Sequence, residues 1–447
     1  KRGVEGDPGA IQSADGAWWS YVPLHNREVH AKHFGAKFDG STDDTVAINK
    51  AISALTAISG SFNPAASYKL VFPAGRAITQ GGHVIPNTVK VDVIGAGRYA
   101  TILYLKSNSN TFLLEMQSAY GAVRQMTLDG NRNGNSTGLE CLVVSASYVK
   151  SEDLFISNAN GDGLAVGKGS GAINARFLNI DVRLCKGYGV NIYPSTGSTD
   201  CQWTDVNVGM SGKSGFNIAT GSQKMVNCHS WGNGLEHDTD NHGYRHTSGG
   251  SMLVGCEAET NLGKGHYIGS GIKSIVITGG KVWGNCSNGV YGYSATHCAV
   301  TGVSIHDNGV NNTGGSTSLS FANIYWEGCT NMSVVGNDMY DAGGALAAGS
   351  YSGTPTYPFP GRPASTFTVS RHYAEGTGSN RNIIANNMMP ANQTRSGNAI
   401  TNVGVANRYS NNETALSTIP NLASNATISL QADYDVINIT GTTDITT

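Results

Sequence analysis

Two glutamates, Glu257 and Glu259, have the residue type and the spacing that best suit a chemical role. In a β-strand, residues i and i+2 point to the same face, so their α-carbons would lie about 6.6 Å apart. Two carboxylates at such a separation can break a glycosidic bond, one as the proton donor and the other as the base or nucleophile. We therefore predict that Glu257 and Glu259 are catalytic, with Asp205 as a further carboxylate that could partner Glu257.

A second group of polar residues lies in the segment GLEHDTDNHGYRH, residues 234–246. Acids and bases follow one another closely there, although only 13% of the chain is charged: Glu236, His237, Asp238, Asp240, His242, Arg245 and His246. A loop that overhangs the glutamates could supply Glu236 as the catalytic acid. The alternatives are a cation site at the three acids, a zinc site at the three histidines, and a solvated loop without a chemical role. We predict no metal and no cofactor.

Aromatic and basic residues recur beside these acids. Sugars present apolar C–H faces that stack on aromatic rings, and exposed rows of large aromatic residues are costly unless something binds to them. We predict that the substrate contacts Trp231, Trp283, His229, His306, Lys281, Arg245 and Tyr340.

Two functions other than hydrolysis remain open. A lyase would remove the proton next to a uronate carboxyl group, with Lys, Arg, His or Tyr as the base. Candidate bases for that step are Lys281, His229, His306, Arg245 and Tyr340. A receptor-binding protein would keep the aromatic residues and lack an aligned carboxylate pair. We favour hydrolysis because paired acids outnumber clustered bases.

Such residues need a regular scaffold, and the middle of the chain repeats with a period of roughly 22 to 28 residues. Each repeat has two β-rich runs separated by turns that contain Asn and Gly. The alignment places Asn233, Asn261, Asn285 and Asn308 in one column, where stacked side-chain amides can bond one another. This pattern predicts a parallel β-helix whose asparagines hold the coils together.

The coil alignment also predicts which residues face the solvent, because alternate strand residues point outward. One outward column reads Asp181, Asn207, His229, Glu257, Lys281, Ser304 and Asp338. The column two residues further along reads Arg183, Gly209, Trp231, Glu259, Trp283, His306 and Tyr340.

Composition excludes several classes of protein. Fifty-nine glycines argue against a helical bundle, and the balance of 29 basic and 31 acidic residues is not that of a nucleic-acid-binding protein. The chain has no run of 18 apolar residues, so we expect no membrane insertion. Its eight cysteines contain no CxxC pair and are expected to be free thiols.

The start of the chain has a different pattern. Thr42, Asp43 and Asp44 precede an apolar run and could cap the free amides of a helix. The predicted buried face of that helix contains Val46, Ile48, Ile52 and Leu55. A helix here would cover the open end of the solenoid, and residues 69–78 then read as strand, turn and strand.

Residues 30–52, HAKHFGAKFDGSTDDTVAINKAI, followed by VFPAG at residues 71–75, resemble the N-terminal segment of the pectate-lyase-like β-helix superfamily. Within it, the arrangement resembles the tailspike depolymerases of bacteriophages. The resemblance implies an all-β, right-handed parallel β-helix with a short N-terminal capping helix. It also implies a homotrimer on the virion tail, assembled in the host cytoplasm, that binds and depolymerises a bacterial capsular or O-antigen polysaccharide outside the cell.

The same comparison suggests a domain organisation. Residues 1–29 are predicted to form a neck, with Trp18 and Trp19 at a subunit interface and with attachment to the tail through a preceding region. Residues 30–90 hold the first coils and the capping helix, and residues 91–420 the β-helix, interrupted by a proline-rich insertion at about 343–375. Residues 421–447 read as the start of a truncated C-terminal β domain.

Overall fold

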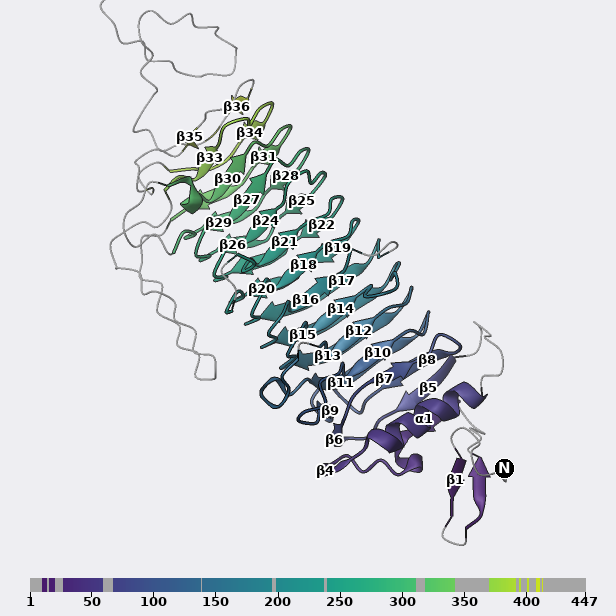
Figure 1. Ribbon diagram of the computed structural model, residues 1–447. Helices are drawn as coiled ribbons and strands as arrows, with labels where there is room; N and C mark the ends of the chain where they lie inside the picture. Colours follow the sequence, from purple (N-terminus) through teal and green to yellow (C-terminus); the bar gives the residue numbers. More distant parts are fainter. Residues whose placement is uncertain are drawn as a thin grey trace, which may run out of the picture. The chain divides into compact units, whose positions relative to one another are not determined.

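The computed structural model describes residues 10–13, 16–20, 27–58, 67–137, 139–194, 198–236, 239–310, 318–341, 370–390, 394, 400–401, 407–410 and 412. The chain divides into two compact units, Lys1–Gly263 and Lys264–Thr447. Within each unit, parallel strands stack coil upon coil (Figure 1). The prediction of an all-β parallel β-helix with few helices is confirmed.

The first unit has one sheet of short strands that repeat once per coil. They are β7 (His83–Ile85), β10 (Leu114–Met116), β12 (Leu142–Val144), β14 (Leu164–Val166), β16 (Val190–Ile192), β18 (Phe216–Ile218) and β21 (Tyr244–His246). Each pairs in parallel with its neighbour in the next coil.

The other wall of the first unit begins with short strands and continues with long ones. The strands are β3 (Glu28–His30), β4 (Asp39–Asp43), β5 (Ser67–Val71), β6 (Gly75–Thr79), β8 (Lys90–Ile94), β9 (Thr101–Leu105), β11 (Ala122–Asp129), β13 (Lys150–Ser157), β15 (Arg176–Arg183) and β17 (Gln202–Gly209). The long strands β11 to β17 each bend at one residue with left-handed backbone: Gln125, Asp153, Asn179 and Asp205.

In the next two coils this bend divides the wall into pairs of short strands. These are β19 (Lys224–Val226) with β20 (His229–Trp231), and β22 (Met252–Val254) with β23 (Glu257–Glu259). Asn227 and Gly255 occupy the bends, again with positive φ. The remaining short elements are β1 (Ala10–Gln12), β2 (Trp18–Ser20), η1 (Ala31–Phe34) and η2 (Arg132–Gly134).

The second unit repeats the same plan. One sheet contains β24 (His266–Ile268), β27 (Val290–Tyr293), β30 (Ile324–Glu327), β33 (Tyr373–Glu375) and β35 (Ile400–Thr401). The other wall contains β25 (Val276–Thr278), β26 (Lys281–Trp283), β28 (Ala299–Thr301), β29 (Ser304–His306), β31 (Ser333–Val335), β32 (Asp338–Tyr340), β34 (Ile383–Ala385) and β36 (Arg408–Ser410), and η3 (Leu319–Phe321) lies between β29 and β30.

Some predicted domain boundaries differ from the observed strands or fall outside the described residues. The predicted insertion at 343–375 is too long at its C-terminal end, because β33 pairs in parallel with β30 and is therefore a coil strand. Residues 342–369 and 413–447, which hold the rest of that insertion and the predicted C-terminal domain, lie outside the described residues. Strand β2, with Trp18 and Trp19, pairs antiparallel with β1, and the subunit interface proposed for these tryptophans stays a prediction.

The interior of the first unit is filled by stacked aromatic rings and a ladder of amides. Phe177 and Trp203 stack with ring centroids 3.9 Å apart, and both are buried. The side-chain amide of Asn233 donates to Asn261 at 2.9 Å. In the second unit, Asn285 donates to Asn308 at the same distance. Within each unit, therefore, the asparagines of the predicted column bond one another between coils.

Helix α1 (Thr45–Ile58) caps the first unit, as predicted. Ile48, Ile52 and Leu55 are buried, but Val46 is 65% exposed. Val46 was wrongly placed on the buried face, because it is two residues from Ile48 and so about 200° around the helix. Asp43 accepts from the backbone amide of Thr45 at 3.1 Å and caps the helix start.

Asp44 stabilises the loop before the helix instead. Its carboxylate is buried and accepts from the backbone amides of Lys37 and Phe38 at 2.7 and 2.9 Å.

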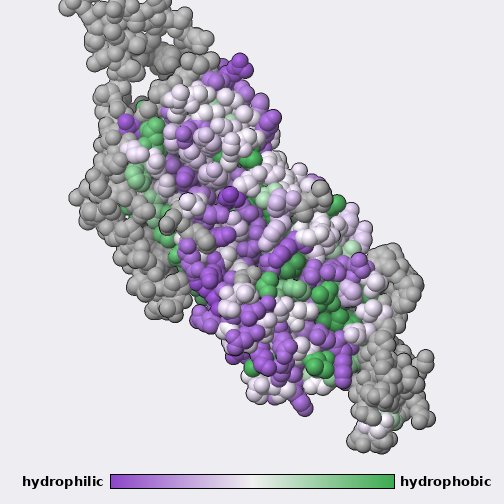
Figure 2. Space-filling view, in the orientation of Figure 1, coloured by the Kyte–Doolittle hydropathy of each residue, from purple (hydrophilic) through white to green (hydrophobic). Residues whose placement is uncertain are grey.

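Hydrophilic residues cover most of the face shown in Figure 2, with hydrophobic residues in separate patches.

All eight cysteines are buried and free of disulfides, as expected from their spacing. Among the described residues, no helix has the length and apolar character needed to cross a membrane.

Candidate functional site

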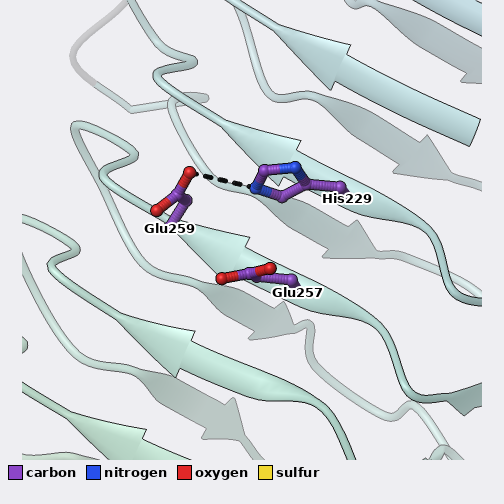
Figure 3. A group of neighbouring side chains, drawn as sticks. All are labelled: His229, Glu257 and Glu259. Carbon is purple, nitrogen blue, oxygen red and sulfur yellow. Dashed lines mark hydrogen bonds and ion pairs between the residues drawn. The ribbon is translucent and has the colours of Figure 1, made fainter.

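Three side chains that could do chemistry meet on the outer face of the first unit: His229 from β20, and Glu257 and Glu259 from β23 (Figure 3). One ligand atom of each residue lies within 4.8 Å of those of the other two. His229 Nε2 is 3.1 Å from Glu259 Oε1. We call these three residues the His–Glu cluster.

The strand register places these side chains together. β20 and β23 pair in parallel with His229 opposite Glu257 and Trp231 opposite Glu259. The intervening residues, Ser230 and Ala258, are fully buried, so their neighbours point outward. The predicted outward columns are therefore confirmed in this unit, from Asn207 through His229 to Glu257 and from Gly209 through Trp231 to Glu259.

Trp231 lies flat against the backbone of the preceding coil. A Cβ atom on Gly209 would be only 2.4 Å from the indole ring, so glycine is needed there to admit the ring. The indole Nε1–H donates to Asn207 Oδ1 at 2.8 Å, and the Arg183 guanidinium carbon lies 5.6 Å from the ring centroid. Trp231 is thus a fixed, half-buried aromatic surface beside Glu259.

The geometry of the His–Glu cluster permits two kinds of chemistry. The nearest oxygens of Glu257 and Glu259 are within 4.8 Å, which is closer to the carboxylate separation of about 5–5.5 Å in retaining glycosidases than to the 6.5–9.5 Å range of inverting ones. The same three residues offer two carboxylates and an imidazole, a donor set that could also hold a divalent cation.

Asp205 does not join the cluster. It lies at the bend of β17 with φ of 54°, is exposed, and accepts a hydrogen bond from the side chain of Asn227. Its neighbours in adjacent coils, Asn179 and Asn227, share the left-handed conformation, which asparagine and aspartate adopt more readily than most residues. The structure therefore gives Asp205 a place in a column of bends, and its catalytic role stays a prediction.

Most polar residues of the segment 234–246 are engaged elsewhere. Glu236 forms an ion pair with Arg132. Arg245 points outward from β21 on the other sheet, where its Nε is 3.2 Å from Asp240 Oδ1. His246 is fully buried, and burial lowers the pKa of its imidazole to about 3. His242 is also buried, whereas His237 and Asp238 lie outside the described residues. Arg245 therefore belongs to a different sheet from the cluster, and its contact with the substrate stays a prediction.

The second unit carries its own aromatic row. Trp283 and His306 stack with centroids 5.8 Å apart, and His306 and Tyr340 stack at 4.4 Å. Their register confirms the outward alignment predicted for these three residues. Lys281, two residues before Trp283, is exposed.

Sequence reasoning missed a polar group beside β12, β14 and β16. Glu140 and Asp162 are only 5% and 8% exposed, and both accept from the hydroxyl of Tyr193. Burial is the main reason that the pKa of Asp162 is raised and that the pKa of Tyr193 is raised as well. Asn191 is a polar residue in an otherwise apolar strand, and this could have indicated the polar group. Glu140 and Tyr193 could not be placed beside it from the sequence, because they lie at coil ends whose lengths vary.

Residues 28–236 match the protein-family model described as rhamnogalacturonase A/epimerase, pectate lyase-like. This part of the chain is therefore similar to pectate-lyase-like domains. The mannuronan C5-epimerase AlgE3 of Azotobacter vinelandii is 32% identical over 122 residues, which cover 25% of this chain and 6% of that protein. The chain thus matches only a small part of this relative.

Solved structures share the fold. The A-module of the mannuronan C-5 epimerase AlgE4 of Azotobacter vinelandii has a TM-score of 0.62 at 17% identity, covering 85% of this chain and 99% of that one. Tailspike protein 3 of bacteriophage CBA120 has a TM-score of 0.54 at 13% identity, covering 96% of this chain and 68% of that one. Phage tailspikes are therefore among the structural neighbours of this chain.

Proposed function

We propose that the outer face around the His–Glu cluster binds a polysaccharide and cleaves it by glycosidic hydrolysis. The observation that carries the proposal is the pair Glu257 and Glu259, whose carboxylates lie close together, face outward and adjoin the flat ring of Trp231. An aromatic surface next to paired carboxylates suits a sugar ring that must be held while its glycosidic bond is broken.

The contacts of the two glutamates suggest their roles. Glu259, whose carboxylate is bonded to His229, acts as the nucleophile that attacks the anomeric carbon. Glu257 donates a proton to the departing glycosidic oxygen and then takes a proton from the water that hydrolyses the glycosyl–enzyme bond. This mechanism retains the anomeric configuration.

The relatives support a polysaccharide as the ligand class. The curated relative is a mannuronan epimerase by name, and tailspikes are among the neighbours in fold. From these likenesses and the N-terminal segment, we propose a phage tailspike that acts on a bacterial capsular or O-antigen polysaccharide and that works as a homotrimer on the virion tail. Fold alone does not carry function, so the cluster must be tested directly.

The first test replaces each glutamate by its neutral isostere. Glu257→Gln and Glu259→Gln should each lower kcat by about 10²–10⁴-fold, because each removes one half of the acid and nucleophile pair. New reducing ends released from bacterial surface polysaccharides give the rate. Glu152→Gln is the matched control, since Glu152 pairs with Arg124 on the same wall but outside the cluster. Full activity in both cluster variants would contradict the proposal.

The epimerase relative favours a second candidate, removal of the proton next to a uronate carboxyl group. His229 would be the base, and Arg183, close to Trp231, would neutralise the carboxylate. Elimination yields an unsaturated uronate that absorbs ultraviolet light, and epimerisation leaves the polymer length unchanged. Hydrolysis yields reducing ends without that absorbance, so product analysis separates the three reactions.

A further inference from the structure

A row of exposed apolar side chains runs along the first unit, where strands β11, β13, β15, β17, β19 and β22 begin. Each member is at least 37% exposed: Tyr120, Tyr148, Ile173, Leu178, Val226 and Met252. Elsewhere among the described residues of the first unit, the large exposed hydrophobic side chains are Val46 and Tyr99. We call the six residues of the row the apolar stripe.

The strand register keeps the stripe in one line. Leu178 lies opposite Thr204, and Thr204 lies opposite Val226 in the following coil. Met252 begins β22, which pairs in parallel with β19. Neighbouring strands lie about 4.8 Å apart, so the five steps from β11 to β22 make a stripe roughly 24 Å long.

Two members of the stripe occupy a corner position that does not suit them. Tyr120 and Tyr148 precede β11 and β13, and both have a φ of 59°, in the left-handed region. The same corner in the following coils is taken by small or polar residues with positive φ: Asn174, Asp200, Ser222 and Gly250. A bulky residue in this conformation costs about 1–3 kcal/mol, so two such tyrosines in adjacent coils indicate a contact that offsets the cost.

The stripe is poorly suited to a sugar. The rings of Tyr120 and Tyr148 stack with centroids 4.6 Å apart and planes 2° apart, so each ring covers one face of the other. The aliphatic side chains of Leu178 and Val226 offer no hydrogen bond to sugar hydroxyl groups. A contiguous exposed apolar row is instead typical of a surface that binds another protein.

The charges beside the stripe fall into two groups. Near β11 and β13 they are neutralised within the chain, because Arg124 and Lys150 both pair with Glu152. Further along, Arg176 and Lys224 are exposed and form no ion pair with any described residue. A protein that covers the stripe should therefore supply a negative charge near these two cations.

The chain itself carries a suitable acid on the corner side of the stripe. Asp200 precedes β17, the strand between those that carry Arg176 and Lys224, and it forms no ion pair within the part of the chain that the structure describes. Rotation about an axis parallel to the stack of coils keeps each coil level with its equivalent and turns the corner side of one copy toward the strand side of the next. Asp200 of one copy would then lie about one coil, or 4.8 Å, from the level of each cation of its neighbour.

We infer that the apolar stripe is the surface at which a second copy of this chain docks side by side, with Asp200 of one copy against Arg176 and Lys224 of the next. The inference rests on the proposed assembly for the number of copies, and it is independent of the proposed hydrolysis.

The first test places a charge in the stripe. Val226→Glu and Leu178→Glu should each raise the dissociation constant for self-association at least about 100-fold, because docking would bury the new carboxylate. Val46→Glu is the matched control, since Val46 is 65% exposed on helix α1 and lies outside the stripe. Sedimentation equilibrium from nanomolar to micromolar concentration measures the constant, and circular dichroism verifies the fold of each variant.

The second test leaves the apolar residues unchanged and exchanges charges. Asp200→Lys alone should weaken self-association about fivefold, because it places like charges opposite each other. Asp200→Lys combined with Arg176→Glu and Lys224→Glu should restore it, since the pairs are then reversed in sign. If the combined variant associates more weakly than Asp200→Lys, the copies do not meet along this edge and the inference is overturned.

Assembly and cleavage are measured separately, so the two proposals can fail separately. Wild-type dissociation constants in both Val226→Glu and Leu178→Glu overturn the assignment of the surface. A wild type that stays a single chain at every concentration overturns the inference, whether or not it cleaves polysaccharide. A wild type that assembles through the stripe but releases no reducing ends overturns the proposed hydrolysis and leaves the docking surface standing.

Discussion

Among single residues, Gly209 controls how Trp231 is presented to a ligand. The ring lies where a side chain at position 209 would be, and its Nε1–H is tied to Asn207. The aromatic surface is therefore pre-organised, so a sugar that stacks on it need not pay for ordering the ring.

Gly209→Ala should displace the ring and destabilise the protein by about 1–3 kcal/mol, since an added methyl group in a packed contact forces the neighbour to move. KM for the polysaccharide should rise as well. Urea unfolding and steady-state kinetics measure the two effects. The control is the same substitution in a Trp231→Ala background, where it should cost little. An equal cost in both backgrounds would show that the ring is not what Gly209 accommodates.

The donor set of the His–Glu cluster raises a separate question about cations. If Glu257 and Glu259 act as acid and nucleophile, dialysis against a chelator should leave hydrolysis within about twofold of its original rate, because no step of this mechanism uses a metal. Activity that disappears with the chelator and returns with Ca²⁺ would instead assign the three residues to a metal site.

The outward direction of these residues could be predicted from the sequence, because alternation in a strand has a strict period of two. The polar group of Glu140, Asp162 and Tyr193 could not, because Glu140, Lys168 and Tyr193 converge from the ends of three coils with loops between them. Glu236 and Arg245 were predicted to act near Glu257 and Glu259 because they lie close to them in the sequence. Their ion-pair partners, Arg132 and Asp240, were visible only after folding.

Among the elements, helix α1 is fastened to the first coils through His83 in β7. The ring nitrogens lie 2.7 Å from Asn49 Oδ1 and 2.6 Å from Thr79 Oγ1, and burial lowers the pKa of His83 from 6.5 to about 4. The helix and two strands therefore share one buried imidazole that must stay neutral.

Acid should destabilise the contact of helix α1 with His83. Below pH 6.5 the unfolded chain takes up a proton at position 83, and the folded chain does so only near pH 4. Stability should therefore fall as pH drops through this window, by up to about 3 kcal/mol, and His83→Gln should remove that part of the slope. Urea unfolding between pH 4 and 7 tests this, with exposed His33→Gln as the control. An unchanged slope in His83→Gln would refute the assignment.

The helix itself was predictable from its capping and apolar residues, and the asparagine column from its spacing. Val46 was placed on the buried face because it is apolar, although its position in the sequence puts it on the opposite side of the helix from Ile48. The predicted end of the proline-rich insertion is too late because β33 has only three residues and gives a weak strand signal. Within β33, the hydroxyl of Tyr373 donates to Glu375 at 2.6 Å.

For the molecule as a whole, the proposed tailspike role predicts a trimer. Light scattering of the purified chain should give about three times the chain mass of 46.7 kDa at micromolar concentration. A mass of one chain over the whole concentration range would contradict that assembly and would confine the proposed carbohydrate site to a single chain.

The eight buried thiols can be used to measure how often individual coils open. Burial raises the pKa of Cys185 to about 12 and that of Cys298 to about 11, so these thiols scarcely react with alkylating reagents while their coils are closed. Cys185 lies in the first unit and Cys298 in the second. Timed alkylation followed by peptide mass measurement would therefore rank the coils by how often each one opens, without adding any label to the chain.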